Sequence, residues 1–212
     1  KAREYDENGT YPMDVMKRAF EQQIMNDSIP KAYGGPGYTN LEAAVITEEL
    51  GAACMGMGTS IMANSLAIAP IILFGNDAQK EKYLRWHTRE FRIAAFCLTE
   101  RDAGSDASAA KTVAVREGDE YVINGSKCFT TNGGYADLFV VFASTAPSKG
   151  PLGMSAFIVD TGLKNGQHAP TFQAEQLHAK PGMYTCDTAM FQMVDHPIPA
   201  SNMLGKEGEG FR

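Results

Sequence analysis

The sequence has little of what metal sites and disulfide frameworks need. Its 212 residues include only four cysteines and four histidines. None of them stands at the Cys-x-x-Cys or Cys-x-x-His spacing that is typical of zinc sites. The cysteines are widely scattered, so we expect reduced thiols, as in a cytosol-like compartment, and no metal centre.

Positive charge and long apolar runs are also scarce. Lys and Arg number 19 against 25 Asp and Glu, and the net charge of −6 lacks the basic footprint of a nucleic-acid-binding protein. The apolar run 61–74 is shorter than the roughly 20 residues that cross a bilayer, and it contains Asn64, Ser65 and Pro70. We expect neither a nucleic-acid partner nor a membrane span. No Gly-x-Gly-x-x-Gly follows a predicted strand, which argues against a Rossmann fold.

The remaining composition, with 44% hydrophobic and 21% charged residues, is that of a globular protein. Up to residue 91 the apolar spacing is helical, with Met13, Met16, Phe20 and Ile24 three and four positions apart. Thr39 and Glu42 form the pattern of a capping box. Four helices are predicted: one from near residue 12, one after Thr39, one over 61–74 and one from Asp77. The second has Ala43, Ile46, Leu50 and Ala53 on one face.

From residue 92 onward the apolar period shortens to two, which is typical of strands. Asn124-Gly125 between two short runs predicts a hairpin turn, because both residues accept positive φ. The predicted fold is α+β and multidomain: an all-α domain over 1–91, then a β domain over 92–205, whose short strands indicate a small barrel or a sandwich. Residues 206–212 resemble the start of a linker to a further domain. The predicted strands are 92–99, 113–117, 121–123, 126–131, 138–143, 155–159 and 188–194.

Two segments of the β region carry candidate binding residues. Small residues in 99–106 allow backbone N–H groups to approach a phosphate, and Ser105 adds a hydroxyl donor. The same segment can also be an ordinary strand-end loop, with Asp106 as the cap of the next element. In 128–134 an aromatic residue, two threonines and a glycine turn offer a face for a flat heterocycle, or simply a threonine-rich strand.

Several short segments occur in a fixed order along the whole chain. They are 29–35 (IPKAYGG), 48–50 (EEL), 75–84 (GNDAQKEKYL), 96–100 (FCLTE), 103–106 (AGSD), 124–127 (NGSK) and 197–205 (PIPASNMLG), followed by Gly208, Gly210 and Phe211.

Together these segments resemble the acyl-CoA dehydrogenase family over essentially all 212 residues. The resemblance implies an N-terminal helical domain and a middle β-barrel domain, while the family's C-terminal four-helix domain is missing from this chain. It also implies FAD as the cofactor, bound between the middle and C-terminal domains, and a homotetramer.

The resemblance assigns cofactor roles to the segment 96–105. Phe96, Leu98 and Gly104 belong to the stretch that wraps the flavin and its pyrophosphate. Thr99 is expected to hydrogen-bond the pyrimidine side of the ring, and Ser105 to bind the pyrophosphate or the CoA moiety of the substrate.

A second group of cofactor residues comes from the family's aromatic-x-Thr strand, here Phe129, Thr130 and Thr131. Phe129 is expected to stack near the flavin and Thr131 to lie by its N5. The chain departs from the family in having Arg101 where most members have Pro, Phe129 where many have Trp, and Tyr184 where Arg is often found.

The implied reaction is α,β-dehydrogenation of an acyl-CoA in fatty acid metabolism. A carboxylate removes the Cα proton, hydride leaves Cβ for flavin N5, and electrons pass to electron-transferring flavoprotein. The base is a glutamate of the missing domain, so we expect no catalytic residue here. The alternatives are an acyl-CoA oxidase or flavin monooxygenase of the same superfamily, or a non-enzymatic fragment or scaffold. The expected compartment is the bacterial cytoplasm or the mitochondrial matrix.

Overall fold

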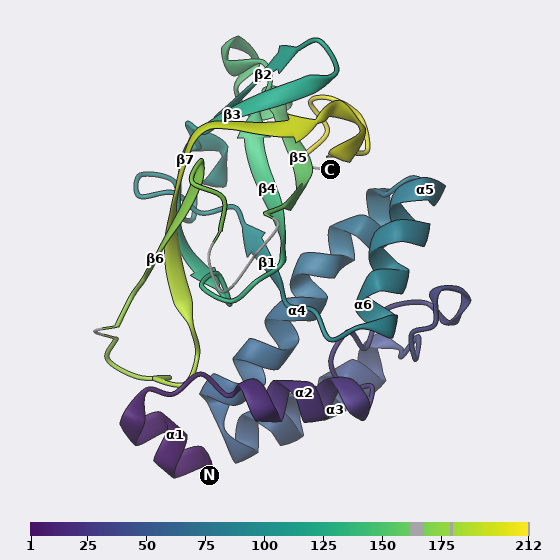
Figure 1. The fold of residues 1–212 in the computed structure, drawn as a ribbon, viewed down its shortest axis with the longest axis vertical. Coiled ribbons are helices and arrows are strands. Elements are labelled where there is room, and N and C mark those ends of the chain that lie inside the picture. Colours follow the sequence, from purple (N-terminus) through teal and green to yellow (C-terminus); the bar gives the residue numbers. More distant parts are fainter. Residues whose placement is uncertain (162–167, 179, 212) are drawn as a thin grey trace.

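The computed structural model describes residues 1–161, 168–178 and 180–211. Helices form its N-terminal part, and the strands form a sheet that stands over one end of them (Figure 1). The helices are α1 (Ala2–Asn8), α2 (Met13–Glu21), α3 (Asn40–Ala53), α4 (Met55–Phe74), α5 (Asp77–Gln79) and α6 (Arg85–Arg89), with a π-helical segment over Lys80–Leu84. Short 3₁₀ turns occur at Lys31–Tyr33, Ala107–Ala109, Pro147–Gly153 and Ala200–Asn202.

The predicted capping box at the start of α3 is confirmed. The Thr39 backbone N–H donates to Glu42 Oε2 at 2.7 Å, and the Glu42 N–H donates to Thr39 Oγ1 at 3.4 Å. Ala43, Ile46 and Leu50 are half-buried on the predicted face, while Ala53 is exposed. The local signal therefore fixed the start of α3 and most of its inner face.

Helix α4 is longer than the predicted 61–74. Its 20 residues are long and apolar enough to cross a membrane by length and composition, but half of the most apolar window is buried in the fold. Asn64, in the middle of the helix, is fully buried and bonded to the sheet. We therefore interpret α4 as the core helix of the protein.

The strands are β1 (Ala94–Cys97), β2 (Val113–Glu117), β3 (Glu120–Thr131), β4 (Leu138–Ser144), β5 (Met154–Asp160), β6 (Phe172–Gln176), β7 (Thr188–Pro199) and β8 (Met203–Leu204). They make one mixed sheet in the order β6-β7-β3-β2-β4-β5-β8. Strand β4 pairs with β5 along one edge, and its other edge is shared by β1 and the start of β2, both parallel to it. All other pairs are antiparallel.

The expected closed β-barrel is wrong: the sheet is open. Within the described residues, β6 pairs only with β7 and the two-residue β8 only with β5, so the two ends of the sheet do not meet. A barrel needs every strand paired on both sides. The sheet instead curls around an aromatic cluster, in which the ring centroids of Phe139, Phe172 and Phe191 lie 4.9 to 5.0 Å apart.

The predicted hairpin at Asn124-Gly125 is also wrong, because β3 runs through it. Gly125 has φ 151°, and a Cβ there would lie 2.5 Å from Thr112 Oγ1, so the position demands glycine. The register shifts here, and Asn124 exchanges two hydrogen bonds with Asp195 of β7. Asn-Gly thus forms a β-bulge. The actual hairpin turns at Gly118, where φ is 62°.

Strand β4 is buried on both faces, which explains its unbroken apolar run. Phe139 and Val141 face the aromatic cluster, whereas Leu138 and Val140 pack with Ile68 and other residues of α4. The sheet therefore packs on two hydrophobic clusters, one on each face of β4, and both clusters include residues of the helices.

The expected linker packs along β5. The Gly208 N–H donates to Ser155 Oγ at 2.9 Å, and the Gly210 N–H donates to the Met154 carbonyl at 2.8 Å. Arg212, the last residue of that segment, lies outside the described residues.

Asn64 joins α4 to the start of β1. Its Oδ1 accepts the Ala94 N–H at 2.6 Å, and its Nδ2 donates to Asn26 Oδ1 at 2.7 Å and to the Arg92 carbonyl at 3.2 Å.

We predict that Asn64→Ala lowers the free energy of unfolding by about 3 kcal/mol, because three buried polar groups lose a partner. Urea unfolding measures this loss. The exposed Asn40→Ala is the control, and equal stability of the two variants would contradict the prediction.

The buried imidazole of His87 predicts acid sensitivity. Its Nδ1–H donates to the Tyr83 carbonyl at 2.8 Å, and Nε2 has no partner among the described residues. Burial lowers the pKa of His87 from 6.5 to about 4. The unfolded chain therefore takes up the proton first as the pH falls, so stability that is complete above pH 6.5 declines toward pH 4, by about 3 kcal/mol from this group.

Urea unfolding between pH 7 and 4 tests this expectation. His87→Gln should flatten the decline, whereas the exposed His178→Gln should leave it unchanged. A decline of equal steepness in the His87→Gln variant would rule out this role of the imidazole.

Candidate functional site

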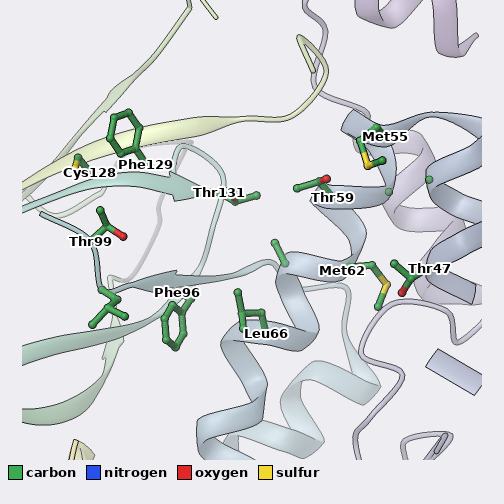
Figure 2. A pocket seen from close by; sticks show the side chains of 14 residues that line it. Thr47, Met55, Thr59, Met62, Leu66, Phe96, Thr99, Cys128, Phe129 and Thr131 are labelled. Atoms are coloured by element: carbon green, nitrogen blue, oxygen red, sulfur yellow. The ribbon is translucent and has the colours of Figure 1, made fainter. Parts of the chain in front are cut away.

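A pocket of about 490 Å³ lies between the α3–α4 pair and the ends of β1 and β3 (Figure 2). The helices supply one wall and the strands the other. Its lining residues are Thr47, Gly51, Met55, Gly58, Thr59, Met62, Ala63, Leu66, Phe96, Leu98, Thr99, Cys128, Phe129 and Thr131.

Five of the predicted cofactor residues meet in this pocket. Phe96, Leu98 and Thr99 come from the end of β1, and Phe129 and Thr131 from the end of β3. The two ends are joined directly, because the Cys128 N–H donates to the Thr99 carbonyl at 2.9 Å. Residues about 30 positions apart thereby become neighbours.

The other three lie outside the lining. The Thr130 side chain is buried on the opposite side of β3, with its Oγ1 3.4 Å from Cys97 Sγ. Gly104 and Ser105 are exposed in the loop after β1, where a Cβ added to Gly104 would meet nothing within 4 Å. The pocket therefore holds the side chains predicted for a ring, but not those predicted for a phosphate.

The helical wall follows no sequence motif. Met55, Thr59, Met62 and Leu66 form a stripe along α4 at spacings of four, three and four residues. In Figure 2 Thr59 points toward Thr131 and Leu66 lies near Phe96, while Met62 lies beside Thr47 of α3. Gly58 permits the close approach of α3, since a Cβ there would lie 3.2 Å from the Leu50 carbonyl carbon. The methionine and glycine spacing was the available signal, but in sequence it is indistinguishable from ordinary core packing.

Phe129 has an unusual backbone for a strand residue. Its φ is 56°, and the β3–β7 register shifts between Lys127 and Thr130, which marks a second β-bulge. Such a backbone costs roughly 1–3 kcal/mol in a residue other than glycine. Phe129 is 67% exposed. The bulge thus turns a large aromatic side chain out of the core and toward the pocket.

A buried ion pair lies next to this bulge. Lys127 Nζ donates to Glu100 Oε1 at 2.8 Å and to the Leu98 carbonyl at 3.0 Å. Burial lowers the pKa of Lys127, against the effect of Glu100. Burial would raise the pKa of Glu100, but hydrogen bonds from Lys127, Thr112 and Lys111 outweigh it, and the net pKa is lowered. The 2.8 Å separation of Nζ and Oε1 is the geometry of an ion pair.

The pocket itself is apolar and uncharged. Its lining, within the part of the chain that the structure describes, includes no Asp, Glu, Lys, Arg or His. Burial raises the pKa of its one thiol, Cys128. The hydroxyl donors are Thr47, Thr59, Thr99 and Thr131. Such a lining fits a flat ring or an alkyl chain and contains no acid or base for proton transfer.

A smaller apolar pocket of about 210 Å³ adjoins the first and shares Leu66 and Phe96 with it. Its other walls include Leu73 of α4 and Phe142 of β4. Leu66 and Leu73 are more than half exposed. The apolar surface therefore continues along α4 beyond the main pocket.

Comparison with known proteins gives the same picture along the whole chain. Residues 1–90 match the N-terminal domain of acyl-CoA dehydrogenases and residues 95–196 match their middle domain. A probable medium-chain specific acyl-CoA dehydrogenase from Caenorhabditis briggsae is 40% identical over 100% of this chain and 51% of its own length.

Solved structures agree. Butyryl-CoA dehydrogenase from Megasphaera elsdenii has a TM-score of 0.89 at 37% identity and covers 98% of this chain and 54% of its own. An acyl-CoA dehydrogenase complexed with FAD, from Bacillus anthracis, has a TM-score of 0.82 at 33% identity, over 93% of this chain and 32% of its own. The chain spans about half the length of the curated relatives it matches.

Proposed function

The chain belongs to the acyl-CoA dehydrogenase family, and from this premise we propose that it forms the helical and middle domains of an enzyme that dehydrogenates acyl-CoA thioesters. The observation that carries the proposal is the pocket, where Phe129, Thr99 and Thr131 meet an apolar helical wall. We place the two domains at 1–91 and 92–205, with 206–212 leading to a third.

We propose FAD as the cofactor, and the residues present fit it. The exposed ring of Phe129 offers a stacking face, and the threonine hydroxyls offer hydrogen bonds in an otherwise apolar site. When bound, the flavin supplies the acceptor for the hydride that leaves Cβ. Thr131 and Thr99 would hydrogen-bond the edge of the ring, and Phe96 and Leu98 would exclude water beside it.

The remaining predicted residues take the outer part of the cofactor in this proposal. Gly104 and Ser105 lie in an exposed loop that can close on a phosphate of the cofactor or of CoA. Thr130 contributes through its backbone, because its side chain faces Cys97.

The acyl chain is proposed to run along the α4 stripe of Met55, Met62 and Leu66. Methionine side chains adapt to chains of different shape, and the wall is apolar. Since the lining has no carboxylate, we propose that the base that removes the Cα proton is a glutamate of the third domain. We further propose that electrons pass to electron-transferring flavoprotein and that the protein forms a tetramer. Its proposed compartment is the bacterial cytoplasm or the mitochondrial matrix.

The decisive experiment is an anaerobic titration of the natural full-length protein with saturated acyl-CoA thioesters of several lengths. Bleaching of the flavin's visible absorption is the expected result, and the most effective thioester identifies the substrate. Rapid oxygen consumption by the reduced protein would indicate an oxidase or monooxygenase instead. A protein that binds no flavin would contradict the proposal.

Thr131 gives a sharper prediction for the same protein. Thr131→Val removes one hydroxyl from the pocket without changing the volume of the side chain much. We expect FAD binding to change less than about threefold, and the rate of flavin reduction to fall about 10- to 100-fold, because a donor that stabilises developing charge is lost. Stopped-flow absorption measures the rate, and Thr10→Val, at an exposed position, is the control. An unchanged rate would remove Thr131 from the mechanism.

A further inference from the structure

The proposed chemistry makes no use of Lys127, although its side chain is fully buried. A buried ammonium needs strong partners, and this one has the carboxylate of Glu100 and the carbonyl of Leu98. The Glu100 carboxylate also accepts the Lys111 N–H at 2.7 Å and the Thr112 N–H at 3.0 Å. The pair thus ties the end of β1 and the segment before β2 to β3.

Its location coincides with the strained part of β3. Lys127 is the last residue in register before the bulge, and Phe129, two residues on, has the positive φ. The Phe129 ring is mostly exposed, so its own packing does little to hold this backbone. After Phe129 the strand pairs again with β7, Thr130 opposite Ala189. Before it, the Cys128 N–H donates to the Thr99 carbonyl, and the Lys127 ammonium bonds to Leu98 and Glu100, the residues on either side of Thr99.

We propose that Glu100 and Lys127 are a positioning pair, which holds the 127–130 bulge against the end of β1 and so presents the Phe129 ring and the Thr131 hydroxyl to the pocket. The part of this inference that concerns FAD binding rests on the proposed function. The part that concerns the backbone of the bulge does not, because it involves only contacts within this chain. Neither residue touches the pocket, since neither belongs to its lining.

The first test is free of ligand. Amide hydrogen exchange at Cys128, measured in the full natural chain, reports the bond to Thr99. Glu100→Gln removes the charge that holds Lys127, and we expect exchange at Cys128 to become at least about tenfold faster, while amides of β4 stay within about twofold. Lys111→Met is the matched control: it removes an exposed lysine but keeps the backbone N–H that Glu100 accepts.

A second variant guards against misfolding. Glu100→Gln combined with Lys127→Met removes both charges and leaves no lone buried ion. The same rise in Cys128 exchange is expected in this folded double variant. Unchanged exchange in either folded variant would overturn the proposal. Loss of the whole fold in both would also overturn it, because the pair would then support the fold in general rather than the bulge.

The second test uses FAD itself with the full-length protein. We expect Glu100→Gln to weaken FAD binding at least about tenfold and to shift the visible absorption of the flavin that remains bound, with no such change in Lys111→Met. A spectral shift reports the surroundings of the ring, which a purely structural loss of stability would not alter. Faster exchange at Cys128 with unchanged affinity and spectrum would overturn the positioning role. If the unaltered protein binds no FAD, the proposed function fails, while the exchange experiment still decides whether the pair holds the bulge.

Discussion

The close packing of α4 against β1 and β4 is the constraint on which the rest of the structure depends. One side of the helix, including Ile68 and Ile71, is fully buried against the sheet, and Asn64 bonds to the backbone of Ala94 within that contact. The other side carries the methionine and leucine stripe of the pocket. A single helix therefore serves as core and as binding wall, which explains why it is apolar all round.

Only those elements that local sequence patterns determine could be predicted from the sequence. The capping box at Thr39 and the strands around 113–117 and 138–143 follow local rules, and the structure confirms them. The barrel failed because closure depends on register and on strand length at the edges, which no local pattern contains. The Asn-Gly hairpin failed because Gly125 passes next to Thr112, a residue that is distant in sequence. Tertiary contact decided between a turn and a bulge.

In the site, the predicted residues are those that belong to a sequence motif. The other lining residues are brought to the pocket only by the folded arrangement of α3 and α4. Phe96, Leu98, Thr99, Phe129 and Thr131 were predicted from the family resemblance, and they meet in one pocket. The helical wall has the composition of any core helix, and no motif marks its residues. Lys127 escaped for a different reason: its burial and its pairing with Glu100 arise only when β3 crosses the end of β1.

The exposure of Phe129 connects these points. A strained backbone that turns an aromatic ring away from its own core lowers stability, and folding alone gives no reason for it. A ligand with a flat face would bury the ring and recover the lost apolar contact, so the strain becomes useful only when the pocket is filled. The strained backbone must therefore persist while the pocket is empty. An ion pair next to the bulge would hold it, whereas a flexible bulge would relax and move the ring out of the pocket. The buried side chains of Glu100 and Lys127 thus lie where the 127–130 bulge has to be held rigid.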